Sequence, residues 1–225
     1  MNSSSDTILR ISPDRAEVFV EQERDGVVSR KSIAPDTLTQ CILASRYSDE
    51  AHATGFLPEG CIAVTMTPKH TWYFLRYPEL YADISYFGTE YPRFPLPRLV
   101  FGFKYLPLEK KVVKSCLCVV KDERLAPDTP LYTYPFSNLH GDSSICTGNN
   151  ALPVYKNPAR LHTLAAYILR LPNNNDMYSS GNNRLNLEFR DLLEQLKGKE
   201  PSVYYSQVLK EKHQTLKDFM DIAGR

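Results

Sequence analysis

The segment at residues 91–97 limits the choice of fold more than any other part of the chain. Its sequence is Tyr-Pro-Arg-Phe-Pro-Leu-Pro, with prolines at positions 92, 95 and 97. Proline has no backbone N–H and disfavours helical backbone at the residue before it, so this segment is extended and not helical. The apolar run Arg98–Phe101 follows directly, and we predict a strand there.

Further short apolar runs, separated by turn residues, predict a domain rich in strands. Asp25-Gly26 is a hairpin signal between the first two runs. The predicted strands are Ala16–Glu23, Val27–Ile33, Cys61–Thr67, Thr71–Tyr77, Lys111–Val120 and Leu131–Tyr134.

Helical periodicity occurs at both ends of the chain and after residue 156. We predict a helix over Ser32–Arg46 and another that begins with Asn157 as N-cap and Pro158 in its first turn, and that stops at Pro172. Two amphipathic helices are expected in the tail, separated by Gly198 and Pro201. The first carries Phe189, Leu192, Leu193 and Leu196, and the second carries Tyr205, Val208, Leu209, Leu216, Phe219 and Met220.

These elements together favour an α+β fold. We expect an antiparallel meander sheet, packed on one face by helices, with an additional N-terminal hairpin and C-terminal helices. The expected domain organisation is a disordered lead-in at 1–7, one main domain at 8–180, and a helical extension at 181–225 packed on it.

Composition excludes several classes of protein. The formal net charge of the 225 residues is +1, which argues against nucleic-acid binding. The sequence contains no long uncharged apolar run, so we predict no membrane span. The start, Met1–Asp6, is polar and unlike a secretory signal. Five cysteines, an odd number, argue against a disulfide framework and fit the cytoplasm. Cys116 and Cys118 would share one face of a strand, as buried apolar residues more readily than as metal ligands.

Residues 135–153 show no regular period and are rich in Asn, Ser and Gly. Long irregular segments inside compact domains are often functional. Cys146 lies here among small polar neighbours, so we expect its thiol to be partly exposed. Such a thiol is either a nucleophile, acting as the thiolate, or an incidental free cysteine.

The order of these features resembles the ubiquitin-conjugating enzyme family. The family's hallmark is His-Pro-Asn, a short loop, and Gly-x-Ile-Cys. Here Phe136-Ser137 stands in place of His-Pro, Asn138 falls at the spacing of the family's asparagine, and Ile145-Cys146 matches its Ile-Cys pair. The stretch Phe94–Phe101 is similar to the family's proline-rich strand start.

The resemblance is narrower to the prokaryotic conjugating enzymes of bacteria known as family D. Within that family the sequence is most similar to protein B of the PRTRC (ParB-related, ThiF-related cassette) system. The matching motifs are Thr129-Pro130-Leu131-Tyr132, Pro135-Phe136-Ser137-Asn138 and Cys146-Thr147-Gly148. The front half shares only its layout with these proteins.

The resemblance implies a ubiquitin-conjugating-like domain and a thioester mechanism. A ThiF-type activating enzyme would pass a ubiquitin-like protein to Cys146, and an amine of a protein target would then take the acyl group. Asn138 would donate to the oxyanion of that attack. Asp142 could orient or deprotonate the amine and His140 could act as a base, although solvated loop residues are the simpler interpretation of both. No metal or organic cofactor is implied.

Two rival functions remain open at this stage. The first is a non-catalytic module with the same fold that only binds a ubiquitin-like protein. The second is a Cys-His hydrolase, for which the fold would have to bring one of the five histidines to Cys146. The retained cysteine favours the conjugating enzyme over the first, and the missing family signature around Cys146 counts against the second.

Overall fold

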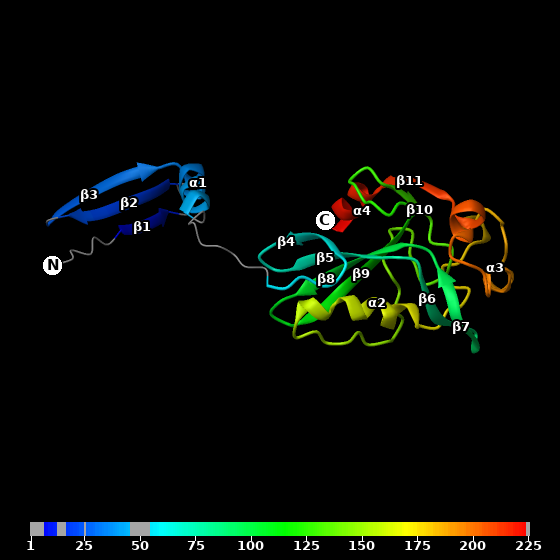
Figure 1. The fold of residues 1–225 in the computed structure, drawn as a ribbon. Helices are drawn as coiled ribbons and strands as arrows, with labels where there is room; N and C mark the ends of the chain where they lie inside the picture. Colours follow the sequence, from blue (N-terminus) through cyan, green and yellow to red (C-terminus); the bar gives the residue numbers. More distant parts are fainter. Residues whose placement is uncertain (1–6, 13–16, 25, 46–54, 224–225) are drawn as a thin grey trace. The chain divides into compact units, whose positions relative to one another are not determined.

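The computed structural model describes residues 7–12, 17–24, 26–45 and 55–223 of the chain. The chain divides into two compact units, 1–54 and 55–225, which Figure 1 shows in ribbon form. This boundary falls inside the main domain that we expected at 8–180. A division into compact units does not test domain limits, and the expected limits stay a prediction. The lead-in expected at 1–7 lies outside the described residues, apart from Thr7.

The N-terminal unit contains a three-stranded antiparallel sheet and one helix. The sheet has the order β1-β2-β3, made by Thr7–Ser12, Glu17–Arg24 and Val27–Ile33, and the helix is α1, Pro35–Ser45. The predicted hairpin is confirmed as β2–β3, and Gly26 follows β2 with a φ of 77°, a conformation that glycine adopts without strain. The hairpin gains β1 as an additional strand, which we did not predict.

The second unit is built on a six-stranded antiparallel sheet of order β11-β10-β9-β8-β5-β4. Every predicted strand of this unit is present, and β8 extends five residues beyond the run Arg98–Phe101. The strands are β4 Cys61–Met66, β5 Thr71–Tyr77, β8 Leu99–Leu106, β9 Lys111–Val120, β10 Pro130–Tyr132 and β11 Glu211–Thr215. An α+β fold with an antiparallel sheet is therefore confirmed, whereas the strand arrangement of a ubiquitin-conjugating enzyme stays a prediction.

Between β5 and β8 the chain forms a separate hairpin, which we did not predict. Its strands are β6, Leu80–Tyr86, and β7, Thr89–Leu96, and they form a two-stranded sheet, with a single further bridge between Tyr86 and Asn173. The prolines at 92 and 95 lie in β7, where a strand with one free edge tolerates a missing N–H. Phe94 of β7 and Phe101 of β8 are both buried in the core, which explains why the extended segment is held in place.

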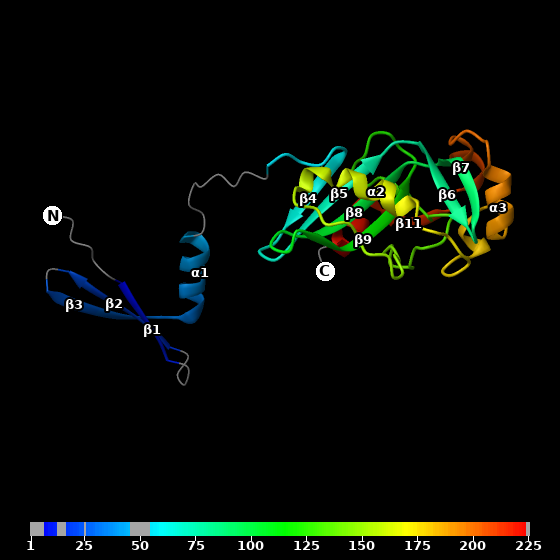
Figure 2. The same cartoon turned by 90° about the horizontal axis from the view of Figure 1, so that it is seen from below.

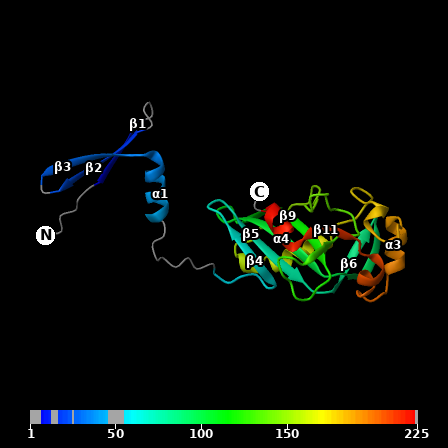
Figure 3. The same ribbon diagram turned by 90° about the horizontal axis from the view of Figure 1, so that it is seen from above.

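The two faces of the main sheet carry separate apolar cores. Tyr73, Leu75 and Phe101 face one core, which also takes in α2, His162–Leu169, and α3, Phe189–Leu196. Trp72, Phe74 and Val100 alternate with them and face the other core, which is closed by α4, Leu216–Ala223. Figure 2 shows α2 in front of the sheet, and Figure 3, from the other side, shows α4 in front.

Helices therefore pack on both faces of the sheet, and the expectation of helices on one face is wrong. The reason is the side-chain alternation of the central strands, since apolar residues point to both faces and each face needs a cover. On the α4 face that cover includes Leu216 and Phe219, whose ring lies 5.9 Å from that of Phe74 in an edge-to-face arrangement.

The tail differs from the expected pair of helices in its second half. The first helix is confirmed as α3, but the second is replaced by three short elements: a single π-helical turn at Tyr204–Val208, strand β11 and helix α4. Strand β11 pairs with β10, and Thr133 N donates to Lys210 O over 2.8 Å at one end of the pair. Residues 211–215 could continue a helix or pair with the free edge of β10. Pairing satisfies the backbone groups of that edge, and the segment forms a strand.

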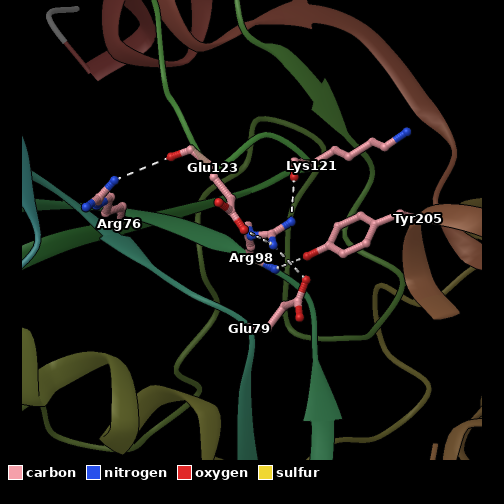
Figure 4. A network of polar contacts seen from close by, with 6 residues as sticks. All are labelled: Arg76, Glu79, Arg98, Lys121, Glu123 and Tyr205. Atoms are coloured by element: carbon pink, nitrogen blue, oxygen red, sulfur yellow. Dashed lines mark hydrogen bonds and ion pairs between the residues drawn. The ribbon is translucent and has the colours of Figure 1, made fainter. Parts of the chain in front are cut away.

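Arg98 ties several of these segments together at one end of the sheet (Figure 4). Its guanidinium contacts the carboxylates of Glu79 and Glu123 at 3.0 and 2.9 Å and donates to Lys121 O over 2.7 Å. Its backbone N–H donates to the hydroxyl of Tyr205 over 2.9 Å. The planar guanidinium can satisfy all three partners at once, so Arg98 fixes the turn between β7 and β8 against the loop that follows β9.

Candidate active site

The irregular segment at 135–153 contains a short hairpin that carries Cys146. Cys146 N donates to Asn138 O over 2.9 Å, and His140 N donates to Ser144 O over the same distance. Asn138 and Ser143 have φ values of 64° and 67°, in the left-handed region that asparagine adopts more readily than most residues. Asn138 and Cys146 are thus opposite each other across the hairpin, which we did not predict for this segment.

Strand β9 supports this hairpin along its length. Ile145 N donates to Ser115 O over 2.8 Å, and Leu117 N donates to Ser143 O over 2.9 Å. The hairpin therefore runs beside β9 next to the end of β10, and it is attached to a central strand of the sheet. A site on such a rigid support is held more precisely than one on a free loop.

The segment that follows α2 holds the other side of the hairpin. The Asn138 side-chain amide donates to Pro172 O over 3.0 Å. The Ser137 hydroxyl, which is almost completely buried, donates to Asn173 Oδ1 over 2.9 Å, and Asn173 N donates to Ser85 O of β6 over 2.9 Å. Three parts of the chain that are distant in sequence are thus joined directly beside Cys146.

Phe136 and Ser137 therefore have structural roles in the place of the family's His-Pro. Phe136 packs in the core with its ring 5.9 Å from that of Phe94 and 6.1 Å from that of Tyr204. Asn157 acts as the predicted cap, since its Oδ1 accepts from Ala159 N over 3.0 Å. It caps the short 3-10 turn Pro158–Arg160 that leads into α2.

The half-buried thiol of Cys146 lies at a cleft of about 230 Å³, which we call the Cys146 cleft. The cleft is also lined by Asn138 and by residues of the loop after α2, among them Asp176. Asn174 holds Asp176 in place, because Asp176 N donates to Asn174 Oδ1 over 2.8 Å and Asn174 Nδ2 donates to Asp176 Oδ2 over 2.9 Å. The full lining is Asn138, Cys146, Thr147, Gly148, Asn150, Leu171, Pro172, Asn174, Asp176 and Met177.

Asp176 is a candidate that the sequence interpretation missed. The run of asparagines after Pro172 was recognised only as a polar loop, although a carboxylate directly after such a run is a signal of an ordered turn. Its closeness to Cys146 depends on the hydrogen bonds of Asn138 and Asn173, which join segments more than 30 residues apart.

The structure does not bring Asp142 and His140 into this cleft. Asp142 accepts hydrogen bonds from the backbone N–H and hydroxyl of Ser144, and it lies 3.5 Å from the ammonium of Lys114. The Ser144 hydroxyl contributes most to holding the pKa of Asp142 below its ordinary value. His140 is exposed and lines a different cavity. Of the predicted site residues, the described chain joins Asn138 and Cys146 at one cleft.

The other four cysteines differ from Cys146. Three of them have environments that disfavour a thiolate, and the fourth lies far from this hairpin in the sequence. Burial raises the pKa of Cys116 to about 11, and burial also raises the pKa of Cys118 and of Cys61. Cys41 is exposed on α1, in the N-terminal unit. Cys116 and Cys118 both lie in the core that α4 covers, as buried apolar residues do.

The described residues give little support for metal or Cys-His chemistry at this site. Among them, no group of three or more His, Cys, Asp or Glu side chains could hold a metal ion. No histidine lines the Cys146 cleft in the described part of the chain. The residues that line the cleft bring a thiol, an amide and a carboxylate together, from Cys146, Asn138 and Asp176.

Comparison with known proteins shows the family of the chain. The sequence profile of prokaryotic E2 family D matches residues 37–220. The chain belongs to this family. The match begins within α1 and includes Asn138, Cys146 and Asp176, and it confirms the resemblance noted from the sequence. No curated protein and no solved structure gave a match.

Membership of prokaryotic E2 family D makes the chain similar to ubiquitin-conjugating enzymes. It supports an interaction with a ubiquitin-like protein. No helix within the described ranges has the length and apolar character needed to cross a membrane.

Proposed function

We propose that this E2-family protein accepts a ubiquitin-like protein on Cys146 as a thioester and transfers it to an amine. The observation that carries the proposal is the common cleft of the Cys146 thiol, the Asn138 amide and the Asp176 carboxylate. The acyl group comes from a ThiF-type activating enzyme. The Cys146 thiolate attacks the activator's thioester carbonyl, and the activator's thiolate leaves.

The second step is harder and uses the rest of the cleft. A neutral amine of the target attacks the new thioester carbonyl, the Cys146 thiolate leaves, and the proton that the amine loses passes to the carboxylate of Asp176. A primary amide has two N–H donors, and Asn138 uses one for Pro172 O. The other N–H remains for the oxyanion that forms during the attack. Neither metal nor organic cofactor enters these steps.

Asp176 is the carboxylate that we propose to orient the attacking amine and to accept its proton. It lines the Cys146 cleft, whereas Asp142 is engaged by Ser144 and Lys114 and His140 lines another cavity. Asp142 and His140 keep the amine-orienting and base roles suggested by the sequence as alternatives to Asp176.

Matched substitutions separate these carboxylates. Asp176→Asn should slow discharge of the Cys146 thioester to free lysine by about ten- to a hundredfold, because charge-assisted hydrogen bonds of this kind are worth roughly 1.5–3 kcal/mol. Asp142→Asn and His140→Gln should leave single-turnover discharge within about threefold of wild type. A slow Asp142→Asn beside a normal Asp176→Asn would transfer the role to Asp142.

A charging assay tests the function as a whole. Purified protein is mixed with its activating enzyme, ATP and the ubiquitin-like protein encoded nearby, and the products are separated with and without reductant. We expect a reductant-sensitive adduct that disappears when lysine is added. A stable complex without any adduct would instead establish the non-catalytic binding module.

Neighbouring genes provide the partners for this assay and test the narrower assignment. A PRTRC-type operon would contain a ThiF-like activator and a gene for a small protein that ends in glycine, and the reaction would take place in the cytoplasm. A chromosomal neighbourhood without either gene would remove the support for similarity to protein B of that system.

A further inference from the structure

A second cavity beside the active-site hairpin is lined by donors and by a lysine but by no carboxylate. Its volume is about 420 Å³, within the usual range for small-molecule sites. We call it the Lys212 cavity. His140 and Ser143 of the hairpin line it together with Lys212 of β11, and it shares Met177 with the Cys146 cleft.

Lys212 has one polar contact in the described chain. Its ammonium donates to Ser143 Oγ over 2.7 Å, and no Asp or Glu carboxylate of the described residues lies within ion-pair distance of it. The groups that act on it electrostatically are the buried Cys118 thiol and Asp142, whose carboxylate is already bound by Ser144 and Lys114. An ammonium has three N–H donors, so two remain.

Other donors face the same space. Ser143 Oγ accepts from Lys212 and Ser179 Oγ accepts from Gly181 N over 3.2 Å, so each hydroxyl keeps its own hydrogen for a further acceptor. The side chains of Asn182 and Thr133 also line the cavity. Burial lowers the pKa of the Lys212 ammonium, because it removes part of the water that would solvate the charge.

We propose that the Lys212 cavity binds a small oxyanion, a phosphate or carboxylate group, held by Lys212 and the surrounding hydroxyl and amide donors. A cation is excluded by the sign of the lining charge, and a neutral ligand would leave the ammonium uncompensated. Because Ser143 is both part of the hairpin and a partner of Lys212, the bound anion contacts the element that carries Cys146. This site is separate from the thioester chemistry and stands without it.

Thermal unfolding of the whole chain tests the proposal. Wild-type protein is measured in sodium phosphate, sodium acetate and sodium chloride at equal ionic strength, so that charge screening is the same in all three, and the general stabilisation by phosphate is subtracted by measuring Lys212→Met in the same salts. We expect phosphate or acetate to raise Tm above the chloride value in a concentration-dependent manner, as ligand binding to the native state requires. The arm with the larger increment identifies the source of the oxyanion.

Two variants and a control test whether the rise of Tm in phosphate or acetate comes from binding in the Lys212 cavity. Lys212→Met should weaken oxyanion binding, measured by isothermal titration with sodium phosphate or sodium acetate, by about ten- to a hundredfold. Lys199→Met, at an exposed lysine after α3, should bind as wild type does. If Lys212→Met does not fold, Asn182→Ala removes one lining donor and should weaken binding by about five- to tenfold.

The rival explanation is that Lys212 only pins the hairpin through Ser143. Lys212→Met would then lower Tm equally in all three salts and leave any phosphate or acetate increment intact. That result would overturn the proposal, as would the absence of a phosphate or acetate increment in wild-type protein.

Discussion

Cys146→Ser should abolish the reductant-sensitive adduct with the ubiquitin-like protein. The thiolate is the attacking group, and a serine hydroxyl in the same place is a far weaker nucleophile at neutral pH. Any adduct that Cys146→Ser does form should be an ester that resists reductant. The measurement is the fraction of protein charged after a fixed time, resolved on gels with and without reductant.

Cys41→Ser is the matched control, because Cys41 is the exposed cysteine of the chain and lies on α1 of the N-terminal unit. It should charge as wild type does. Cys61→Ser should do the same, since burial disfavours its thiolate. A reductant-sensitive adduct that survives Cys146→Ser and vanishes in Cys41→Ser would move the nucleophile to the N-terminal unit.

Loss of the Asn138 amide should slow transfer to lysine while leaving loading nearly normal. Loading exchanges one thioester for another, whereas attack by an amine builds charge on the carbonyl oxygen, and a donor that acts only in that step lowers its barrier. Removing such a donor typically costs about 2.7–4 kcal/mol, or roughly a hundred- to thousandfold in rate. Single-turnover discharge to free lysine, measured beside loading yield, gives both quantities.

The backbone at Asn138 decides which variants are informative. With a φ of 64°, alanine would add strain of its own, so Asn138→Gly is the better substitution and Asn138→Ala the comparison. Asn138→Asp keeps the shape but has no donor when ionised, so it should also discharge slowly.

The rival role for Asn138 is structural, through its bond to Pro172 O. In that case Asn138→Gly would reduce loading, discharge and Tm together, because the hairpin would separate from the segment after α2. Equal losses in both steps would contradict the oxyanion role. Normal discharge in Asn138→Gly and Asn138→Asp would assign that role to another donor of the cleft.

Much of the local structure followed from the sequence because it depends on neighbouring residues. Asn157 and Pro158 begin a helical segment by capping and by a preset φ, and the apolar runs around Thr71–Tyr77 and Lys111–Val120 form strands as predicted. Cys146 and Asn138 were associated through the resemblance to the family motif, whereas the hairpin that places them opposite each other was not predicted.

Long-range pairing decided the elements that the sequence interpretation missed. The prolines at 92 and 95 concealed β7, which forms because Phe94 is buried and β6 supplies a partner. Residues 211–215 have helical periodicity with their neighbours, yet they complete the edge of β10 as β11. In both cases contacts with residues distant in sequence stabilise the strand, and the helix or strand propensity of the local sequence does not reflect these contacts.

The same division applies to the candidate site. The sequence by itself determined the family and pointed to Cys146 and Asn138 as the proposed nucleophile and its partner, because the motif around Cys146 is local and the family match extends over residues 37–220. Only the tertiary structure separated Asp142 and His140 from the cleft and brought Asp176 into it. Residues 142 and 176 are on different segments, and the bonds from Ser137 and Asn138 to the chain after α2 decide which of the two lines the cleft with Cys146.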